Sequence, residues 1–386
     1  MKCKLGEIVD VIMGQSPKSE FYNTEEKGYP FLQGNRTFGL KYPTFDIYTT
    51  VLTKLAKAGD IIMSVRAPVG DLNITPVDMC LGRGVCSLRM KNGNQSYLFY
   101  MMKYYIPYLL QKESGTVFGS VSKRDITELE VDIIEDVEKQ KRIVSYLEMI
   151  DDKIELNNAI NKNLEQQAQA IFKAWFVDFE PFNEEMPSDW IIGTVDDLGT
   201  EIICGKTPPT KKKEYYGGNT PFITIPDMHG CVYNVSTERY LSAAGVALQP
   251  KKTLPPNTVC VSCIGTAGLV NLVSEKSQSN QQINSIVPKE GISAYYIYLL
   301  MQTLSETINK LGQSGSTIVN LNKTQFGKIQ VAIPSEQVLC NFDTLCKPLF
   351  EMILSNQKEN IELANLRDAL LPKLMSGELD VSDIDL

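Results

Sequence analysis

The sequence predicts an α+β protein made of two globular mixed α/β domains in tandem repeat, separated by two long helices. Three observations support this prediction. Segments of the first half recur about 190 to 200 residues later, two stretches have the apolar spacing of long helices, and the rest mixes short β-rich runs with turn residues. The predicted segments are a first domain, a central helical spacer, a second domain and a C-terminal helical spacer, at 1–134, 135–180, 181–334 and 335–386.

The first domain repeats in the second at offsets that grow from 191 to 200. Glycine, proline and aromatic positions recur together, which is unlike the scattered agreement of unrelated sequences. The matched pairs are GQSP (14–17) with GKTP (205–208), YPFLQGNRTFG (29–39) with TPFITIPDMHG (220–230), SYLFYMMKYY (96–105) with AYYIYLLMQT (294–303), and SGTVFGSVSKRDITELEVDI (114–133) with SGSTIVNLNKTQFGKIQVAI (314–333).

Each domain combines β-rich runs with one clear helix. GDIIMSV (59–65) and NTVCVSC (257–263) are rich in β-branched and apolar residues and are bounded by turn residues, which predicts strands. The aromatic runs predict helices over Gln95–Lys112 and Ser293–Lys310. This mixture indicates α+β domains with irregular loops.

The two spacers have the apolar pattern of a coiled coil, in steps of four and three residues. The first helix is expected from about 137 to 176, and adding 199 reproduces its pattern in the second. The second copy replaces Ala168 by Arg367 and Leu147 by Cys346. The predicted helix–helix seam is Ile143, Leu147, Ile150, Ile154, Asn157, Asn161, Leu164, Ile171, Trp175, Phe342, Leu349, Ile353, Asn356, Asn360, Leu363, Leu370 and Leu374.

Both copies place two asparagines at the same seam positions, Asn157 and Asn161 in the first and Asn356 and Asn360 in the second. A polar residue in such a seam fixes the register of the pair. A chain that repeats one unit can fold with approximate two-fold symmetry, so we expect the helices to pack on each other as an antiparallel coiled coil. The alternative is a parallel coiled coil between two chains.

Composition excludes several classes of protein. The chain has 386 residues, enough for two or more domains, and no apolar run of the roughly 18 residues that a membrane span needs. The N-terminus is interrupted by Glu7 and Asp10 and does not resemble a signal peptide. Nine cysteines without regular spacing suggest free thiols in a reducing, cytoplasmic compartment.

The net charge of −8 is unevenly distributed. Residues 1–134 hold 16 Lys and Arg against 14 Asp and Glu, and residues 181–334 hold 12 against 12. The two helical spacers hold 6 against 10 and 4 against 10. The acidic excess therefore lies in the spacers, and the globular domains are close to neutral.

Motifs for catalysis are weak. Gly199 and Gly205 are separated by five residues where a phosphate-binding loop needs four, and Pro208-Pro209 follow where its helix should begin. Cys260-x-x-Cys263 is a single pair, and His229 is the only histidine. Adjacent acids such as Asp151-Asp152 are expected to be solvated. No metal site or cofactor is expected in this chain.

The loops of both domains are rich in side chains that bind nucleic acid. Arg, Asn and Gln form paired hydrogen bonds with base edges, whereas Lys and hydroxyl groups mostly contact phosphates. We expect DNA contacts from Gln15, Ser16, Lys18, Gln33, Asn35, Arg36, Arg66, Arg83, Ser122, Lys123 and Arg124, and from Lys206, Thr207, Lys211, Lys212, Lys213, Thr224, Asp227, His229, Asn280, Gln281, Gln282, Asn322 and Lys323. Any one of these could equally be an ordinary polar loop residue, but their repetition on two domains favours binding.

The whole chain resembles the specificity (S) subunit of type I DNA restriction-modification systems. The resemblance rests on the domain order and on local patterns: LGEIVDVIMGQSP, the two matched segments that close the domains, EKQKRIVSYLEMIDDKIELNNAINKNLEQQAQAIFKAWFVDFEPF in the central helix, and ELANLRDALLPKLMSGEL in the last one. Together these patterns are specific, although the short GxxP pieces alone are not.

The resemblance implies that each domain is a target-recognition domain for one half of a split double-stranded DNA site, and that the helices set the gap. It implies two modification subunits, which hold S-adenosylmethionine and methylate adenine, and restriction subunits that use ATP and Mg²⁺. The chain itself would be non-catalytic and would have no membrane partner. Two alternatives remain: a protein-binding coiled-coil scaffold, or an enzyme of DNA metabolism that uses Cys260, Cys263 or His229.

Overall fold

The structure is a computed structural model that describes residues 1–111, 119–313 and 319–380. Unit 1 comprises Met1–Glu155 together with the chain from Leu363 onward, and unit 2 comprises Leu156–Glu362. The boundaries between the two units fall inside the long helices, so they do not test the four predicted segment boundaries, which stay a prediction. None of the helices in the described ranges has the length and apolar character needed to span a bilayer.

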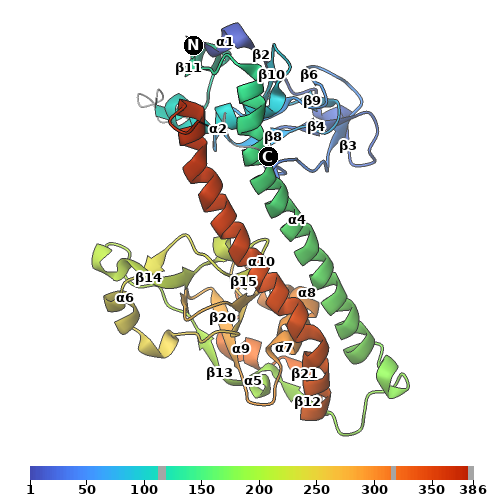
Figure 1. Cartoon of the computed structure of the whole chain (residues 1–386). Coiled ribbons are helices and arrows are strands. Elements are labelled where there is room, and N and C mark those ends of the chain that lie inside the picture. The colour runs from blue at the N-terminus through green and yellow to red at the C-terminus, as the bar shows by residue number, and fades with distance from the viewer. Residues whose placement is uncertain (112–118, 314–318, 381–386) are drawn as a thin grey trace. The chain divides into compact units, whose positions relative to one another are not determined.

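Unit 1 contains two small sheets and a separate antiparallel pair of strands (Figure 1). The main sheet is antiparallel, in the order β2-β10-β7-β8, and the second has the order β3-β5-β4-β9-β6, with β4 and β9 parallel. Strand β1 pairs with β11. The elements are β1 (Lys2–Lys4), α1 (Leu5–Ile8), β2 (Val9–Met13), η1 (Ser19–Phe21), β3 (Tyr22–Asn23), β4 (Tyr29–Leu32), β5 (Tyr48–Thr49), β6 (Leu55–Ala56), β7 (Ile61–Ser64), β8 (Leu72–Ile74), β9 (Met79–Leu81), β10 (Val85–Met90), α2 (Gln95–Gln111), α3 (Lys123–Thr127) and β11 (Glu130–Asp132).

Unit 2 repeats this plan, and its strand β14 has eight residues where the equivalent β4 has four. Its main sheet has the order β13-β20-β17-β18-β15, its second sheet β16-β14-β19, and β12 pairs with β21. The elements are η2 (Glu180–Phe182), β12 (Ile191–Thr194), α5 (Val195–Leu198), β13 (Gly199–Cys204), η3 (Lys213–Tyr215), β14 (Tyr216–Ile223), η4 (Ile225–Met228), β15 (Tyr233–Asn234), β16 (Tyr240–Leu241), α6 (Ala243–Ala247), η5 (Pro250–Lys252), β17 (Val259–Ser262), β18 (Val270–Val273), β19 (Gln278–Ser279), β20 (Ile283–Pro288), α7 (Ala294–Thr303), α8 (Ser305–Gly312), α9 (Lys323–Gly327) and β21 (Gln330–Ile333).

The strand register confirms the internal repeat. In the main sheets, Ser87 lies opposite Ile62 in unit 1 and Ser285 lies opposite Cys260 in unit 2, an offset of 198 on both strands. The parallel pair also recurs, since β4 and β9 of unit 1 correspond to β14 and β19 of unit 2. The predicted α+β class with tandem domains is therefore confirmed.

The long helices are α4 (Val137–Phe176) and α10 (Glu336–Ser376). The predicted limits of the first, about 137 to 176, agree with the structure. In unit 2 the two helices run antiparallel, because the amide of Asn157 donates to Asn360 and that of Asn356 donates to Asn161, both at 2.9 Å. Asn157 thus pairs with the repeat copy of Asn161, and Asn161 pairs with the repeat copy of Asn157. This reciprocal pairing is what two-fold symmetry produces locally, and it differs from a parallel coiled coil between two chains.

The predicted seam residues face inward, and none of the seventeen is exposed. The buried surface of the helices is wider than this seam, because Phe172 and Phe350 also lie in the core of unit 2. Phe350 stacks on Tyr295 of α7 with ring centroids 4.6 Å apart. Each helix therefore packs against its partner helix and against a sheet-and-helix domain at the same time.

The predicted helix Ser293–Lys310 is wrong in one respect, because the chain forms two helices, α7 and α8, with a break at Leu304. The side-chain amide of Asn309 donates to the carbonyl of Ala267 at 3.0 Å, so α8 is held against the β17–β18 loop. This tertiary contact accompanies the break between α7 and α8, and the helical pattern of the sequence does not reveal it. The counterpart, α2, matches its predicted range up to Gln111; Lys112 and residues 114–118 and 314–318 of the matched segments lie outside the described residues.

The expectation that Asp151 is solvated is also wrong. Its side chain is 3% exposed and accepts from the Arg367 guanidinium at 2.7 Å and from the Tyr100 hydroxyl at 2.7 Å. The replacement of Ala168 by Arg367 in the second repeat is thus explained, since unit 1 uses this arginine to neutralise a buried carboxylate. Asp152 is exposed, as expected, and pairs with Lys41 at 3.4 Å.

Candidate nucleic-acid interface

Three chain segments meet at one edge of unit 1, where β2, β4 and β9 end. Glycines are required there, because a β-carbon at Gly14 would collide with the Gly82 carbonyl and one at Gly84 with the Gln33 carbonyl. We call this place the first junction, and it consists of Gly14–Ser16, Gln33 and Gly82–Gly84. Direct backbone packing of this kind leaves little room for the segments to move relative to one another.

The Ser16 hydroxyl lies at the centre of the first junction. It accepts from the side-chain amide of Gln33 at 3.0 Å and from the backbone N–H of Arg83 at 3.1 Å. The side chains of Gln15, Gln33 and Arg83 are exposed around it. Four of the residues predicted from the sequence are therefore brought together from three separate segments.

A second junction, consisting of Gly205–Thr207, Thr224 and Asn280–Gln282, occupies the equivalent place in unit 2. A β-carbon at Gly205 would collide with the carbonyls of Ser279 and Asn280. The Thr207 hydroxyl donates to the side-chain oxygen of Gln281 at 2.7 Å. The second junction thus also joins a hydroxyl of the GxxP loop to the turn before the last strand of the main sheet.

The two junctions are structurally equivalent, because four backbone hydrogen bonds at the first junction each have a counterpart between the corresponding residues at the second. At the first junction, N–H groups donate to carbonyls from Gly14 to Val85 (3.0 Å), Gln15 to Leu81 (2.9 Å), Gly82 to Leu32 (2.7 Å) and Val65 to Gly84 (2.9 Å). At the second, in the same order, they donate from Gly205 to Ile283 (3.2 Å), Lys206 to Ser279 (2.9 Å), Asn280 to Ile223 (3.1 Å) and Cys263 to Gln282 (2.8 Å).

Several predicted residues form hydrogen bonds that shape the loops. Thr224 is 4% exposed and caps η4 together with Asp227, whose carboxylate accepts from the Thr224 hydroxyl at 2.6 Å and from the Glu238 backbone N–H at 2.7 Å. His229 follows this turn and is exposed. Asn280 is buried and exchanges hydrogen bonds with Gln282. Thr224, Asp227 and Asn280 therefore hold the backbone that presents their neighbours.

Ser122 and Asn322 have the same role in the two units. Ser122 is the N-cap of α3 and Asn322 is the N-cap of α9, and each side chain accepts from the backbone N–H three residues later. Lys123, Arg124 and Lys323 are exposed in the first turn of these short helices. The cap residues thus fix the place of the cations that follow them.

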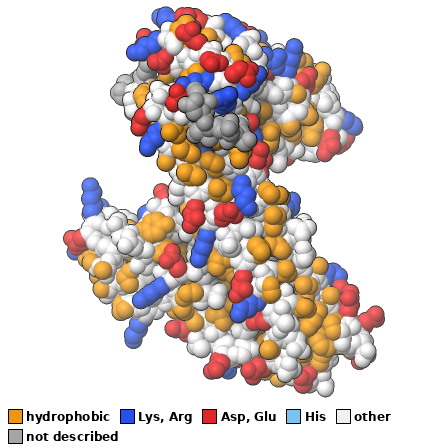
Figure 2. All heavy atoms as spheres, viewed as in Figure 1, with side chains coloured by type: hydrophobic (Ala, Val, Ile, Leu, Met, Phe, Trp, Pro, Cys, Tyr) orange, Lys and Arg blue, Asp and Glu red, His pale blue; other side chains and the backbone are white. Residues whose placement is uncertain are grey.

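The predicted cations differ in whether an acid neutralises them. Lys18 lies 3.8 Å from Glu20, Arg36 lies 2.6 Å from Asp46, and Lys212 lies 3.9 Å from Glu214; Asn35 is hydrogen-bonded to Asp71. Figure 2 likewise shows blue and red side chains interspersed. Within the described ranges, the predicted cations that form no ion pair are Arg66, Arg83, Lys123, Arg124, Lys206, Lys211, Lys213 and Lys323.

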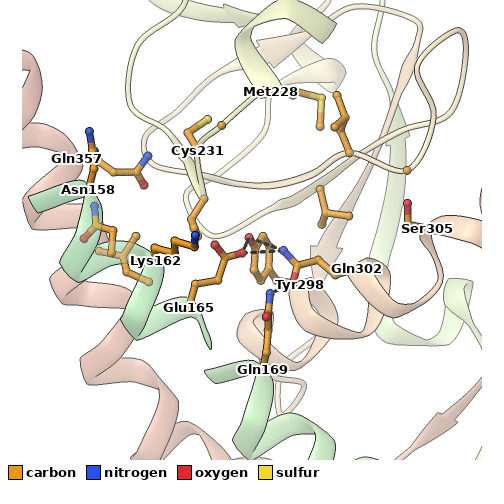
Figure 3. Close-up of a pocket in the computed structure, with 17 residues that line it drawn as sticks. Asn158, Lys162, Glu165, Gln169, Met228, Cys231, Tyr298, Gln302, Ser305 and Gln357 are labelled. Atoms are coloured by element: carbon orange, nitrogen blue, oxygen red, sulfur yellow. Dashed lines mark hydrogen bonds between the residues drawn. The ribbon is translucent and has the colours of Figure 1, made fainter. Parts of the chain in front are cut away.

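Unit 2 also has a cavity of about 620 Å³ between α4 and the loops that carry Met228 and Cys231 (Figure 3). Its carboxylate, Glu165, accepts from the Tyr298 hydroxyl and the Gln302 amide, both at 2.9 Å. Burial raises the pKa of the Cys231 thiol to about 11 and also raises the pKa of Tyr298. Because both groups remain protonated at neutral pH, neither the Cys231 thiol nor the Tyr298 hydroxyl is an activated nucleophile.

The cysteines considered as catalytic candidates are also poorly suited to that role. Burial raises the pKa of Cys260 and of Cys263 to about 12, so both are thiols at neutral pH. In the described part of the chain, no group of three or more His, Cys, Asp and Glu side chains could hold a metal ion. The arrangement instead provides donors and acceptors at two rigid loop junctions.

The fold defines a chain built from two copies of one domain and a helical pair. A family model described as "Type I restriction modification DNA specificity domain" matches residues 1–166 and 187–345. The HindI specificity subunit of Haemophilus influenzae is 34% identical over 84% of this chain and 88% of its own length. The chain therefore belongs to the family of type I restriction-modification specificity subunits.

Two further comparisons agree with this membership. The MjaIX specificity subunit of Methanocaldococcus jannaschii is 27% identical over 84% of this chain and 79% of its own length. The crystal structure of the type I restriction-modification S subunit from M. genitalium superposes with a TM-score of 0.60 at 17% identity, covering 97% of this chain and 95% of that one. The latter likeness concerns the fold alone.

Proposed function

We propose that this chain is the DNA sequence-recognition subunit of a type I restriction-modification complex, and that each domain recognises one half of a bipartite target. The observation that carries this proposal is the pair of equivalent loop junctions, one on each unit of a chain that belongs to the specificity-subunit family. Equivalent backbones with different side chains suit the recognition of two different half-sites by one architecture.

The long helices set the gap between the half-sites and bind the partner proteins. In unit 2 the reciprocal asparagine pairs hold α4 and α10 in one register, as a spacer of fixed length requires. We place two modification subunits along the acidic helices and, beyond them, the restriction subunits. The chain is non-catalytic in this proposal; the modification subunits hold S-adenosylmethionine, and the restriction subunits use ATP and Mg²⁺.

A domain exchange tests the proposal. Residues 1–134 are replaced by the corresponding segment of a homologue, the chain is co-expressed with its modification subunits, and methylated adenines are mapped across a genome. We expect one half of the methylated sequence to change while the other half and the gap stay fixed. The reciprocal exchange of residues 181–334 is the matched control, and it should change only the other half.

The same experiment separates the alternatives. If the methylated sequences stay fixed in both exchanges, the chain is a protein-binding scaffold and does not recognise DNA. For the enzyme alternative, the purified chain is assayed alone for methyl transfer and ATP hydrolysis. We expect neither activity, and a measurable rate of either one would contradict a non-catalytic subunit.

A further inference from the structure

The two junctions have different side chains at one equivalent position, the first residue after Gly82 in unit 1 and after Asn280 in unit 2. Arg83 occupies it in the first junction and Gln281 in the second, an offset of 198 that agrees with the strand register. Both side chains are exposed. This position therefore combines an equivalent backbone place with a difference in hydrogen-bonding chemistry.

The backbone at this position is held from both sides. The turn that contains Arg83 donates from Gly82 N–H to the β4 end and accepts at Gly84 O from Val65 N–H, and the turn that contains Gln281 makes the same two bonds. The Arg83 backbone N–H is additionally fixed by Ser16 at 3.1 Å. Such support is what a side chain needs in order to read a base edge with defined geometry.

Both side chains also keep hydrogen-bonding groups available for a base. Among the described residues, the Arg83 guanidinium forms no ion pair, in contrast to Arg36, which is held by Asp46 at 2.6 Å. The Gln281 side-chain oxygen accepts from Thr207 at 2.7 Å, which orients the amide and leaves its NH₂ group and a second lone pair available.

Arg83 and Gln281 differ in the hydrogen-bond donors and acceptors that they present to a base. An arginine presents two parallel donors, which match the two acceptors O6 and N7 of guanine in the major groove. A glutamine presents one acceptor and one donor, which match N6–H and N7 of adenine. A serine or threonine hydroxyl in the same place could contact either base and would not distinguish them.

We propose that Arg83 and Gln281 are the equivalent specificity-determining residues of the two domains, with Arg83 recognising a guanine in one half-site and Gln281 recognising an adenine in the other. This inference rests on the proposed function, since it assigns bases to the domains that recognise DNA. Ser16 and Thr207, both in the GxxP loops, act as positioning residues: Ser16 holds the backbone of Arg83, and Thr207 holds the side chain of Gln281.

Single substitutions in the assembled complex with modification subunits test this assignment, with methylated adenines mapped across a genome. For Arg83→Ala we expect preference for one guanine to fall by roughly 5- to 150-fold, with the other half-site and the gap unchanged. For Gln281→Ala we expect the same loss at one adenine of the other half-site. Gln281→Glu, which only accepts hydrogen bonds, should shift preference there toward cytosine.

Lys27→Ala is the control, because Lys27 is an exposed cation of the same domain that Glu25 neutralises at 2.5 Å and is not among the predicted DNA contacts. It should leave every base preference unchanged. The unaffected half-site within each variant reports that the complex has folded and assembled.

Two results would overturn the assignment while the proposed function stands. One is an unchanged methylated sequence in Arg83→Ala and Gln281→Ala. The other is a uniform loss of methylation without any change in base preference, which would identify the two residues as phosphate contacts. If the wild-type complex methylates no bipartite sequence, the proposed function itself fails.

Discussion

At the scale of single residues, the ion pair between Asp151 and Arg367 is unusual because both of its side chains are largely withdrawn from solvent. Burial alone would lower the pKa of Arg367, but the hydrogen bond and the charge of Asp151 raise it overall. Tyr100 donates to the second carboxylate oxygen, and the half-buried Lys103 ammonium lies 3.9 Å from the same oxygen. A buried pair of this kind is more costly to break than to replace as a whole.

Removing one partner should therefore destabilise unit 1. For Arg367→Met we expect a loss of about 3–5 kcal/mol in the free energy of unfolding, because the Asp151 carboxylate stays buried without its guanidinium. Chemical denaturation of the purified chain measures this loss.

Two further variants sharpen that test. The double variant Asp151→Phe with Arg367→Ala introduces the side chains found at the equivalent repeat positions, Phe350 and Ala168, and should recover most of the lost stability. Arg36→Met removes an exposed pair and should cost only about 0–1 kcal/mol. Equal effects of Arg367→Met and Arg36→Met would contradict the role of burial.

A carboxyl group of unit 2 gives a pH-dependent prediction. Burial raises the pKa of Asp343, which accepts a hydrogen bond from the Ser293 hydroxyl. A folded pKa above the unfolded one means that the protonated form is favoured by folding, a contribution that is present at low pH and lost as the pH rises through the folded pKa. Asp343→Asn, which stays neutral, should therefore stabilise the chain at neutral pH but not below the unfolded pKa of about 3.9.

Unfolding midpoints measured between pH 3 and pH 8 check this expectation. Asp189→Asn is the control, because Asp189 is exposed and should change stability little at any pH. A stability difference for Asp343→Asn that is constant across this range would show that ionisation of Asp343 is not the cause.

One residue-level prediction, that Asp151 is solvated, failed for a physical reason. The seam pattern identifies which side chains of a helix face the other helix, but not which face the globular domain covers, so Asp151 was expected to be solvated. The substitution of Ala168 by Arg367 was a usable signal, since a cation within an apolar seam needs a partner. The sequence likewise could not show that Thr224 is buried, because a capping threonine and a DNA-contacting threonine look alike.

At the scale of elements, the sequence was most informative where a period persists over many residues. The limits of α4 and the antiparallel pairing with α10 follow from about 40 residues of regular spacing and from the matched asparagines. The break between α7 and α8 could not be predicted in this way, because it accompanies a contact between Asn309 and the distant Ala267. The junctions were predicted only as separate lists of residues, since their assembly depends on how β4 packs beside β9.

The helix pair gives a prediction about spacing. Inserting one heptad within residues 143–175 keeps the seam on the same face and lengthens the helix by about 10 Å at 1.5 Å per residue. We expect methylated half-sites of unchanged sequence separated by a different gap. A methylome of that variant with the original gap would contradict the spacer role, and an insertion of the same seven residues before Met186, outside the seam, is the control.

At the scale of the whole molecule, the charge balance limits what the chain can do alone. Its formal charge is −8, and the junctions display only a few unpaired cations. The sequence-independent part of DNA affinity grows with the number of phosphates that Lys and Arg neutralise. The chain alone should therefore bind duplex DNA weakly, and the modification subunits should supply much of the missing positive charge.

Binding titrations at several salt concentrations test this expectation. We expect the chain with its modification subunits to bind a target duplex more tightly than the chain alone and with a steeper salt dependence, because more counterions are released. A duplex of scrambled sequence controls for specificity. Equal affinity and equal salt slope with and without the modification subunits would show that the specificity subunit itself supplies the phosphate contacts.

The composition of unit 1 has a consequence for how the protein is made. Its core includes Leu371 and Leu374 of α10, packed with Ile143 and Leu147 of α4, whereas unit 2 is one continuous stretch. During synthesis a ribosome therefore polymerises all of unit 2 before the last residues of unit 1 exist. The half of the protein that is begun first is completed last, and a nascent chain interrupted after Glu362 would keep unit 2 but leave the core of unit 1 open to chaperones and proteases.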